Sequence, residues 1–261
     1  WKASQMQDFN NSGEFDYPVH TGNWALLVAS SKGWANYRHQ ADVFAIYQQL
    51  KQAGYTDDRI ILIAEDDIAD NVSNPNKGVV QVTIGGNNVY EQVEIDYRMS
   101  ELQAKDILAI LSGEKSENLP TVIESNENDN LFVFWSGHGV PGAICWDEEA
   151  YAMTGDELSS VFEDMNRKRR YRKLLMMVEA CFSGGVMEQC EGIPGMLFIT
   201  AANGDETSKA DVFNGEMKVW MSNRFTSTFI EQITDNREVA MRDLYYRLFI
   251  NTVGSHVMVY N

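Results

Sequence analysis

Short apolar runs that end at small or polar residues recur along the chain. Six of them predict strands, at residues 24–29, 60–64, 131–135, 174–178, 196–201 and 256–260. Because most of these runs are continuously apolar, both faces of each strand should be covered, which is typical of parallel sheets. The pattern therefore predicts a sheet in the middle of the molecule.

Between these runs, apolar residues recur at helical spacing. Three stripes predict amphipathic helices: Val43, Ile46, Tyr47 and Leu50; Leu158, Val161, Phe162 and Met165; Met241, Leu244, Tyr245 and Leu248. Thr154 and Glu157 have the spacing of a capping box before the second stripe. A weaker helix is expected over residues 100–111, with Ser100 and Gln103 in capping positions. The alternation of strands and helices predicts an α/β fold with a mainly parallel six-stranded sheet and helices on both faces.

Three segments depart from the alternation. Residues 79–93 contain two alternating stretches around a Gly-Gly-Asn-Asn turn and predict an inserted β-hairpin. Residues 114–130 are acidic and predict a long surface loop. The polar beginning of the chain, residues 1–22, predicts an N-terminal arm, and residues 23–261 predict a single domain.

Composition limits the class of protein. With 44% hydrophobic residues among 261, the chain can bury a core without a disulfide framework. Its cysteines are Cys145, Cys181 and Cys190. A bridge between Cys145 and Cys190 would fit an oxidising compartment, whereas three free thiols would fit any compartment. We expect a secreted, periplasmic or vesicular location rather than a cytoplasmic one.

Charge argues against nucleic acid as a partner, because the net charge of −17 repels phosphate. A basic cluster over residues 167–173 opposes this trend and is a solvated helix end, a docking patch or a processing site. No apolar run reaches 18 residues, so no membrane span is expected. We expect a monomer.

A thiol and an imidazole come just after two of the predicted strands. His138 lies just past the run at 131–135, and Cys181 lies just past the run at 174–178. Ligand sites of open α/β sheets lie at the carboxyl ends of the strands, and a Cys/His pair there points to nucleophilic catalysis. Gly137 and Gly139 would let backbone N–H groups approach a reacting carbon, and the N–H of Cys181 could complete an oxyanion hole. Alone, the cysteine would be a core residue and the histidine a turn residue.

Several strings resemble the legumain family, which comprises the asparaginyl endopeptidases and the catalytic subunit of the GPI-anchor transamidase. They are Asn-Tyr-Arg-His-Gln-Ala-Asp at 36–42, Asp-Asp-Ile-Ala at 66–69, Asn-Pro-Asn-Lys-Gly at 74–78, Ser-Gly-His-Gly at 136–139, Glu-Ala-Cys at 179–181, Thr-Ala-Ala-Asn at 200–203 and Ser-His-Val-Met at 255–258. The resemblance implies a caspase-like three-layer α/β/α sandwich. It also implies that Cys181 is the nucleophile, His138 the general base and Asn36 the residue that orients it, with the amides of Gly139 and Cys181 holding the oxyanion.

The resemblance also implies a substrate pocket. Arg38, His39 and Glu179 match its residues, and Thr207 and Ser208 match a pair of serines. Where legumains place a second pocket carboxylate, this chain has Asn223, and where animal and plant legumains have Asp before the histidine, it has Gly137. The first departure weakens recognition of an amide NH₂, so Asp becomes acceptable beside Asn. The second removes a side reaction that depends on that Asp.

The expected function is a cysteine endopeptidase that cleaves peptides after Asn, with Asp as a second candidate, through a thioester at Cys181. The alternatives are a transpeptidase that uses the same thioester, and a catalytically silent binding module of the same fold. No cofactor and no metal are expected. The acidic pair Asp66 and Asp67 is interpreted as hydrogen bonding within a loop, because no metal-binding constellation surrounds it.

Overall fold

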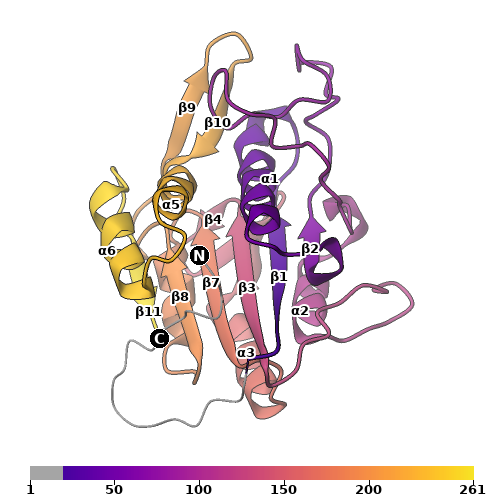
Figure 1. Ribbon diagram of the computed structural model, residues 1–261, viewed down its shortest axis with the longest axis vertical. Helices are drawn as coiled ribbons and strands as arrows, with labels where there is room; N and C mark the ends of the chain where they lie inside the picture. The colour runs from indigo at the N-terminus through magenta and orange to yellow at the C-terminus, as the bar shows by residue number, and fades with distance from the viewer. Residues whose placement is uncertain (1–19) are drawn as a thin grey trace.

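The computed structural model describes residues 20–261, so the predicted arm at 1–22 lies almost wholly outside them. A six-stranded sheet forms the centre of the molecule (Figure 1), in the order β11-β8-β7-β3-β1-β2. Its strands are β1 (Gly22–Ala29), β2 (Ile60–Ile63), β3 (Asp129–Ser136), β7 (Lys173–Glu179), β8 (Met196–Thr200) and β11 (Met258–Tyr260). All neighbours are parallel except β11, which runs antiparallel to β8. The prediction of a mainly parallel six-stranded sheet is confirmed.

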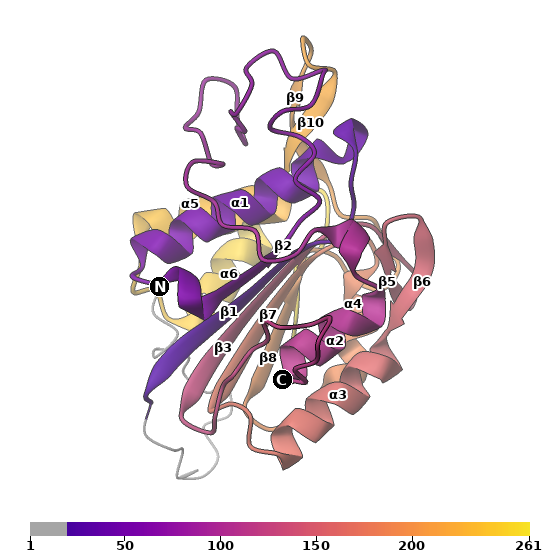
Figure 2. The same cartoon turned by 90° about the vertical axis from the view of Figure 1, so that its right-hand side faces the viewer.

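Helices cover both faces of this sheet, as Figure 2 shows. One face carries α1 (Tyr37–Gln52), α5 (Arg224–Asp235) and α6 (Met241–Asn251). The other carries α2 (Ala104–Ser112), α3 (Gly155–Arg167) and α4 (Ser183–Met187). Short 3-10 turns lie at Trp34–Asn36, Asp57–Arg59, Met99–Glu101 and Glu188–Cys190. The three-layer α/β/α arrangement predicted from the alternation is therefore present.

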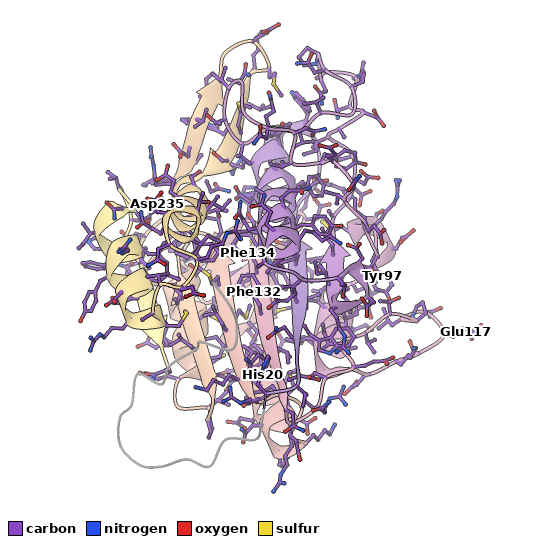
Figure 3. The ribbon with its side chains drawn as sticks, viewed as in Figure 1. His20, Tyr97, Glu117, Phe132, Phe134 and Asp235 are labelled. Carbon is purple, nitrogen blue, oxygen red and sulfur yellow. The ribbon has the colours of Figure 1, made fainter. Side chains whose placement is uncertain are left out.

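The two cores explain why the strands are continuously apolar. Along β3, Phe132 and Phe134 belong to the core under α1, α5 and α6 (Figure 3), while Leu131 and Val133 belong to the core under α2, α3 and α4. Phe132 contacts the ring of Phe229 in α5, with ring centroids 6.5 Å apart. Each fully buried side chain of this size stabilises the fold by about 1.5–3 kcal/mol relative to an exposed one.

The helix predictions hold with one shift and one omission. Thr154 Oγ1 accepts from the N–H of Glu157, and Glu157 accepts from the N–H of Thr154, so the capping box of α3 is confirmed. The weaker helix begins only at Ala104, because residues 99–101 form a separate 3-10 turn. The sequence analysis assigned no helix to α5, although Phe225 and Phe229 lie one turn apart on its buried face.

The predicted β-hairpin at 79–93 is wrong, because this segment contains no strand. One backbone bond, from the N–H of Val89 to the carbonyl of Val80 (2.8 Å), joins its two arms. Side chains bind several of the other backbone groups. Tyr37 OH donates to the carbonyl of Gln81 and accepts from its N–H, and Gln48 donates to the carbonyl of Val89. The segment is thus bound to α1 rather than paired as a ribbon.

Two small sheets extend beyond the carboxyl ends of the central strands instead. One consists of β4 (Gly139–Val140), β5 (Ala143–Trp146) and β6 (Glu149–Thr154), and the other of β9 (Ala210–Asn214) and β10 (Val219–Asn223). In Figure 1, β9 and β10 extend beyond the carboxyl ends of the parallel strands of the central sheet. Both sheets therefore flank the edge at which a ligand is expected.

Two open alternatives of the sequence analysis are also decided. The three cysteines are free, so no bridge joins Cys145 and Cys190. In the basic cluster, Arg167 and Lys168 form ion pairs with Asp164 inside α3. These contacts support a solvated helix end. In the part of the chain that the structure describes, no helix has the length and apolar character needed to cross a membrane.

Candidate active site

Sheet register brings His138 and Cys181 to equivalent positions. Ser136, the last residue of β3, pairs with Glu179, the last residue of β7. His138 and Cys181 each come two residues later, so both leave the sheet at the same level on neighbouring strands. On the other side of β3, Ser136 also pairs with Ala29 at the end of β1, which directs the next loop toward the same edge. The predicted meeting of thiol and imidazole rests on this register.

Asn36 determines which nitrogen of His138 carries the proton. Its Oδ1 lies 2.8 Å from His138 Nε2, and its Nδ2 donates to the carbonyl of Lys32 at 2.9 Å. Because that carbonyl only accepts, the amide orientation is fixed and Oδ1 must accept from Nε2–H. Nδ1 is then the unprotonated nitrogen that can take a proton. Burial, and then the charge of Arg38, lower the pKa of His138, which keeps the ring neutral.

His39, predicted as a pocket residue, packs against His138. It is 2% exposed, and its Nδ1 lies 2.5 Å from Ser31 Oγ. Its ring meets that of His138 edge to face, with centroids 4.7 Å apart. Burial, the charge of Arg38 and His138 lower the pKa of His39 well below its usual value, so this neighbour stays neutral. The structure thus makes His39 a wall that holds the orientation of His138.

Cys181 lies in the turn between β7 and α4, where backbone segments approach closely. A Cβ atom at Gly139 would lie 2.1 Å from the carbonyl oxygen of Cys181, so only glycine fits at that position. A Cβ atom at Gly137 would lie 1.9 Å from the hydroxyl of the buried Ser30. These contacts explain why glycines flank His138, and they leave no space for an Asp at 137.

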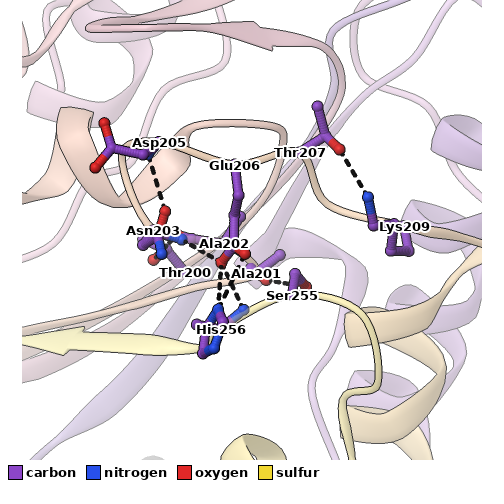
Figure 4. Close-up of polar contacts among 10 residues, drawn as sticks. All are labelled: Thr200, Ala201, Ala202, Asn203, Asp205, Glu206, Thr207, Lys209, Ser255 and His256. Atoms are coloured by element: carbon purple, nitrogen blue, oxygen red, sulfur yellow. Dashed lines mark hydrogen bonds and ion pairs between the residues drawn. The ribbon is translucent and has the colours of Figure 1, made fainter.

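The loop at 201–209, between β8 and β9, brings Ser208 beside Cys181. Ser208 Oγ lies 3.8 Å from Cys181 Sγ, whereas Thr207 Oγ1 accepts from Lys209 Nζ. Glu206 holds the loop (Figure 4): its carboxylate accepts from the N–H of His256 (2.6 Å), and its carbonyl accepts from the N–H of Phe182 (2.8 Å). Of the predicted pair, only Ser208 contacts the thiol. His256 lies just before β11, not inside the strand as predicted.

Two buried carboxylates meet the first turn of α5. Glu179 Oε2 accepts from both the N–H and the hydroxyl of Thr226, each at 2.9 Å. Asp42 accepts from the N–H of Asn223 (3.2 Å), from its Nδ2 (2.5 Å) and from the hydroxyl of Ser136 (2.9 Å). The N-terminus of a helix stabilises negative charge, so it offsets part of the cost of burying these groups.

Burial nevertheless raises the pKa of both acids. Desolvation, and then the neighbouring Asp42, raise the pKa of Glu179 to about 8. Desolvation raises the pKa of Asp42 to about 7, against the hydrogen bonds that it accepts and the charge of Arg38. Because two neighbouring buried carboxylates repel each other, the pair holds a proton to higher pH than an exposed carboxyl group would.

Arg38 is the cation of this group. Burial lowers its pKa, whereas the charges of Asp42, Cys181 and Glu179 favour its cationic form. Arg38 and Asp42 lie one turn apart on α1, so their side chains share a helix face. Asp42 was not among the predicted site residues, although it is the last residue of the string at 36–42 and lies four residues after Arg38, the spacing of one helix turn.

The acidic pair at 66–67 has the loop role that the sequence predicted. Asp67 accepts from the N–H of Gly33 (2.7 Å) and from Gln40 Nε2 (2.6 Å), and Asp66 Oδ1 accepts from Tyr90 OH (2.6 Å). These bonds tie the segment to the loop that carries Asn36. Within residues 20–261, no cluster of three acidic, histidine or cysteine side chains could hold a metal ion.

Known proteins are similar to this chain in sequence and in fold. The chain is 31% identical to legumain of Rattus norvegicus over 244 residues, which cover 91% of this chain and 56% of that protein. It is 31% identical to the GPI-anchor transamidase of Bos taurus over 250 residues (93% and 62%) and 30% identical to that of Saccharomyces cerevisiae over 252 residues (92% and 60%). The chain thus spans less than two thirds of the length of these relatives.

Among solved structures, caspase-1 from Spodoptera frugiperda superimposes with a TM-score of 0.56 at 12% identity and covers 98% of this chain and 92% of that one. The fold is therefore caspase-like. The sequence profile of the peptidase C13 family matches residues 23–261. That match and the relatives above support a cysteine-peptidase-like function. With the match extending over almost the whole chain, the protein belongs to the peptidase C13 family.

Proposed function

We propose that the protein is a cysteine endopeptidase that cleaves peptide bonds after Asn and, more slowly, after Asp. Cys181 Sγ attacks the scissile carbonyl carbon while His138 Nδ1 takes the thiol proton. The same proton passes to the leaving amine as the C–N bond breaks, which leaves a thioester at Cys181. Water then attacks the thioester with His138 as base and releases the acid. The observation that supports this proposal most is the hydrogen bond between Asn36 and His138. It leaves Nδ1 of His138 unprotonated at the edge of the sheet where Cys181 lies.

Backbone amides stabilise the negative oxygen of the tetrahedral intermediate in this proposal. The N–H groups of Gly139 and Cys181 are the candidates, because the two residues are in contact at the reacting position. Loss of one such donor typically costs about 10²–10³ in kcat. A side chain at position 139 would push the two backbone segments apart.

Arg38 and Glu179 supply the specificity. Arg38 donates to the side-chain oxygen of the substrate residue, because its guanidinium has donors that no carboxylate of the described residues pairs within ion-pair distance. Glu179 Oε1 is buried without a hydrogen-bond partner among the described residues, so it can accept from a substrate NH₂ when Glu179 is ionised. An asparagine side chain presents one acceptor and one double donor, which matches this pair.

The test is hydrolysis of matched peptides that carry Asn, Asp, Arg or Ala before a reporter amine, with Cys181→Ala as the control. We expect the Asn peptide to be cleaved fastest, the Asp peptide more slowly and the other two hardly at all. Equal rates for wild type and Cys181→Ala would refute the proposal, and a preference for Arg or Ala would refute the specificity.

A second candidate is transpeptidation, since two of the relatives reported above are named transamidases. An amine would attack the thioester in place of water, and the acyl group would pass to that amine. Adding a peptide with a free N-terminal amine and searching for the ligated mass distinguishes the two reactions. Product that contains only the hydrolysed acid would exclude transpeptidation under those conditions.

The preference for Asn over Asp should rise with pH. Below pH 8, Glu179 is largely protonated and does not repel a substrate carboxylate, whereas above pH 8 it is ionised. Cleavage after Asp should therefore fall as pH rises from 6 to 9. Cleavage after Asn should not fall, because His138 stays neutral and the ionised Glu179 is a better acceptor for the substrate NH₂. We expect the ratio of kcat/KM for Asn over Asp peptides to rise about tenfold across this range. In Glu179→Gln, which does not titrate, the ratio should be independent of pH, and a rise as steep as in wild type would contradict this assignment.

A further inference from the structure

Asn223 precedes the first turn of α5 but does not cap it. Its side chain accepts no bond from the N–H groups of the helix. Both of its donors, the backbone N–H and Nδ2, go to Asp42. An asparagine at this position usually accepts from the second or third helical N–H. Here Glu179 already accepts from the N–H of Thr226, so the carboxylates do the capping and the amide of Asn223 is free for another task.

Asp42 fixes the orientation of that amide. An ionised carboxylate accepts hydrogen bonds and donates none, so the NH₂ end of Asn223 must face it. At 2.5 Å, the Nδ2–Oδ2 contact leaves the side chain no freedom to turn over. Asn223 Oδ1 is then directed away from Asp42, and no residue among 20–261 donates a hydrogen bond to it. The side chain presents a bare acceptor.

This acceptor belongs to the same group of charges as the proposed pocket. Asp42 shares its helix face with Arg38, and the charge of Asp42 acts directly on Glu179. Glu179 Oε1, 1% exposed as a residue, is a second acceptor without a partner among the described residues. This group of charges therefore contains one donor, Arg38, and two acceptors without a partner among the described residues, Glu179 Oε1 and Asn223 Oδ1. That set matches the oxygen and the two hydrogens of a carboxamide.

We propose that Asp42 is a positioning residue that turns the carbonyl oxygen of Asn223 toward the substrate and thereby makes Asn223 an acceptor that selects Asn over Asp. The inference rests on the pocket of the proposed function. A substrate carboxylate has no N–H to donate. Its oxygen would face Asn223 Oδ1, and the lone pairs of the two oxygens would repel each other. Buried polar groups left unpaired in this way reject the wrong ligand strongly. The amide oxygen does not itself titrate, and it keeps this role as long as Asp42 is ionised.

Binding measurements in a Cys181→Ala background test the inference without turnover. The ligands are one peptide with Asn, the same peptide with Asp, and the same peptide with an N,N-dimethylated Asn side chain, which keeps the oxygen but has no N–H. The variants are Asp42→Asn, which keeps the shape but lets either end of the Asn223 amide face it, and Asn223→Leu. A third is the exchange Asp42→Asn with Asn223→Asp, in which the new amide donates to the new carboxylate and leaves an acceptor toward the ligand.

The Asn peptide should bind the parent at least tenfold more tightly than the other two. Asp42→Asn and Asn223→Leu should each reduce that ratio about tenfold or more, and the exchange should restore it. Equal loss for all three peptides in Asp42→Asn, or no recovery in the exchanged variant, would mean a merely structural role and would overturn the inference. If the wild-type protein does not hydrolyse the Asn peptide but still binds it selectively, the proposed hydrolysis is refuted and the inference about Asp42 and Asn223 stands.

Discussion

Replacing His138 with Ala should lower kcat/KM for an Asn peptide by about 10³- to 10⁴-fold. In the proposed mechanism His138 is the base, and the hydrogen bond from its Nε2 to Asn36 Oδ1 leaves Nδ1 as the nitrogen that accepts the proton. Without it, the thiol proton must leave to water, and the leaving amine has no acid. Steady-state hydrolysis of the Asn peptide measures this loss.

The graded control lies at Asn36. Asn36→Asp retains an acceptor for Nε2–H and should cost less than Asn36→Ala, which frees the ring to present the wrong nitrogen. Both variants should keep the midpoint of thermal unfolding near that of wild type, because Asn36 is half-buried at the surface of the site. Equal activities for Asn36→Ala and wild type would show that the hydrogen bond does not select the tautomer.

The sequence predicted that the thiol and the imidazole lie at one edge of the sheet because the signal for each is local. Each of His138 and Cys181 comes just after a continuous apolar run, and parallel strands deliver the residues beyond their carboxyl ends to one edge. The sheet register then makes their positions equivalent, which the run lengths alone suggested. The family resemblance added Asn36 and Arg38 to the predicted site. In the structure, Asn36 forms a hydrogen bond with His138, and Arg38 interacts with the charges of Cys181 and Glu179.

Asp42 was beyond the reach of that reasoning for a physical reason. Its partners Ser136 and Asn223 are distant in sequence, and only the closed sheet and the placement of α5 bring them together. The hairpin expected at 79–93 failed in a related way. Apolar and polar residues do alternate in this segment. However, Tyr37 and Gln48 of α1 form hydrogen bonds with its backbone groups, which are then not available for pairing between two strands. Contacts between segments distant in sequence determine both the surroundings of Asp42 and the structure of residues 79–93. The pattern of hydrophobic and polar residues along the chain does not predict such contacts.

Arg38→Met should lower kcat/KM for the Asn peptide about 10²- to 10³-fold, with most of the loss in KM. Methionine retains an apolar stem but offers no donor to the substrate oxygen, so the carboxamide would enter a site with acceptors only. The change also removes the cation beside Asp42 and Glu179, so both pKa values should rise further and the pair should hold its protons to higher pH.

Protonation of the acids limits the damage to the fold. Neutral carboxyl groups do not repel each other, and the first turn of α5 still donates to them, so the free energy of unfolding should fall by only about 1–3 kcal/mol. Arg38→Lys, which keeps the charge but loses the planar fork, should be intermediate in kcat/KM and close to wild type in stability. An Arg38→Met variant that loses no more stability than this and hydrolyses Asn and Ala peptides equally would assign Arg38 to recognition. One that loses only stability would remove it from the pocket.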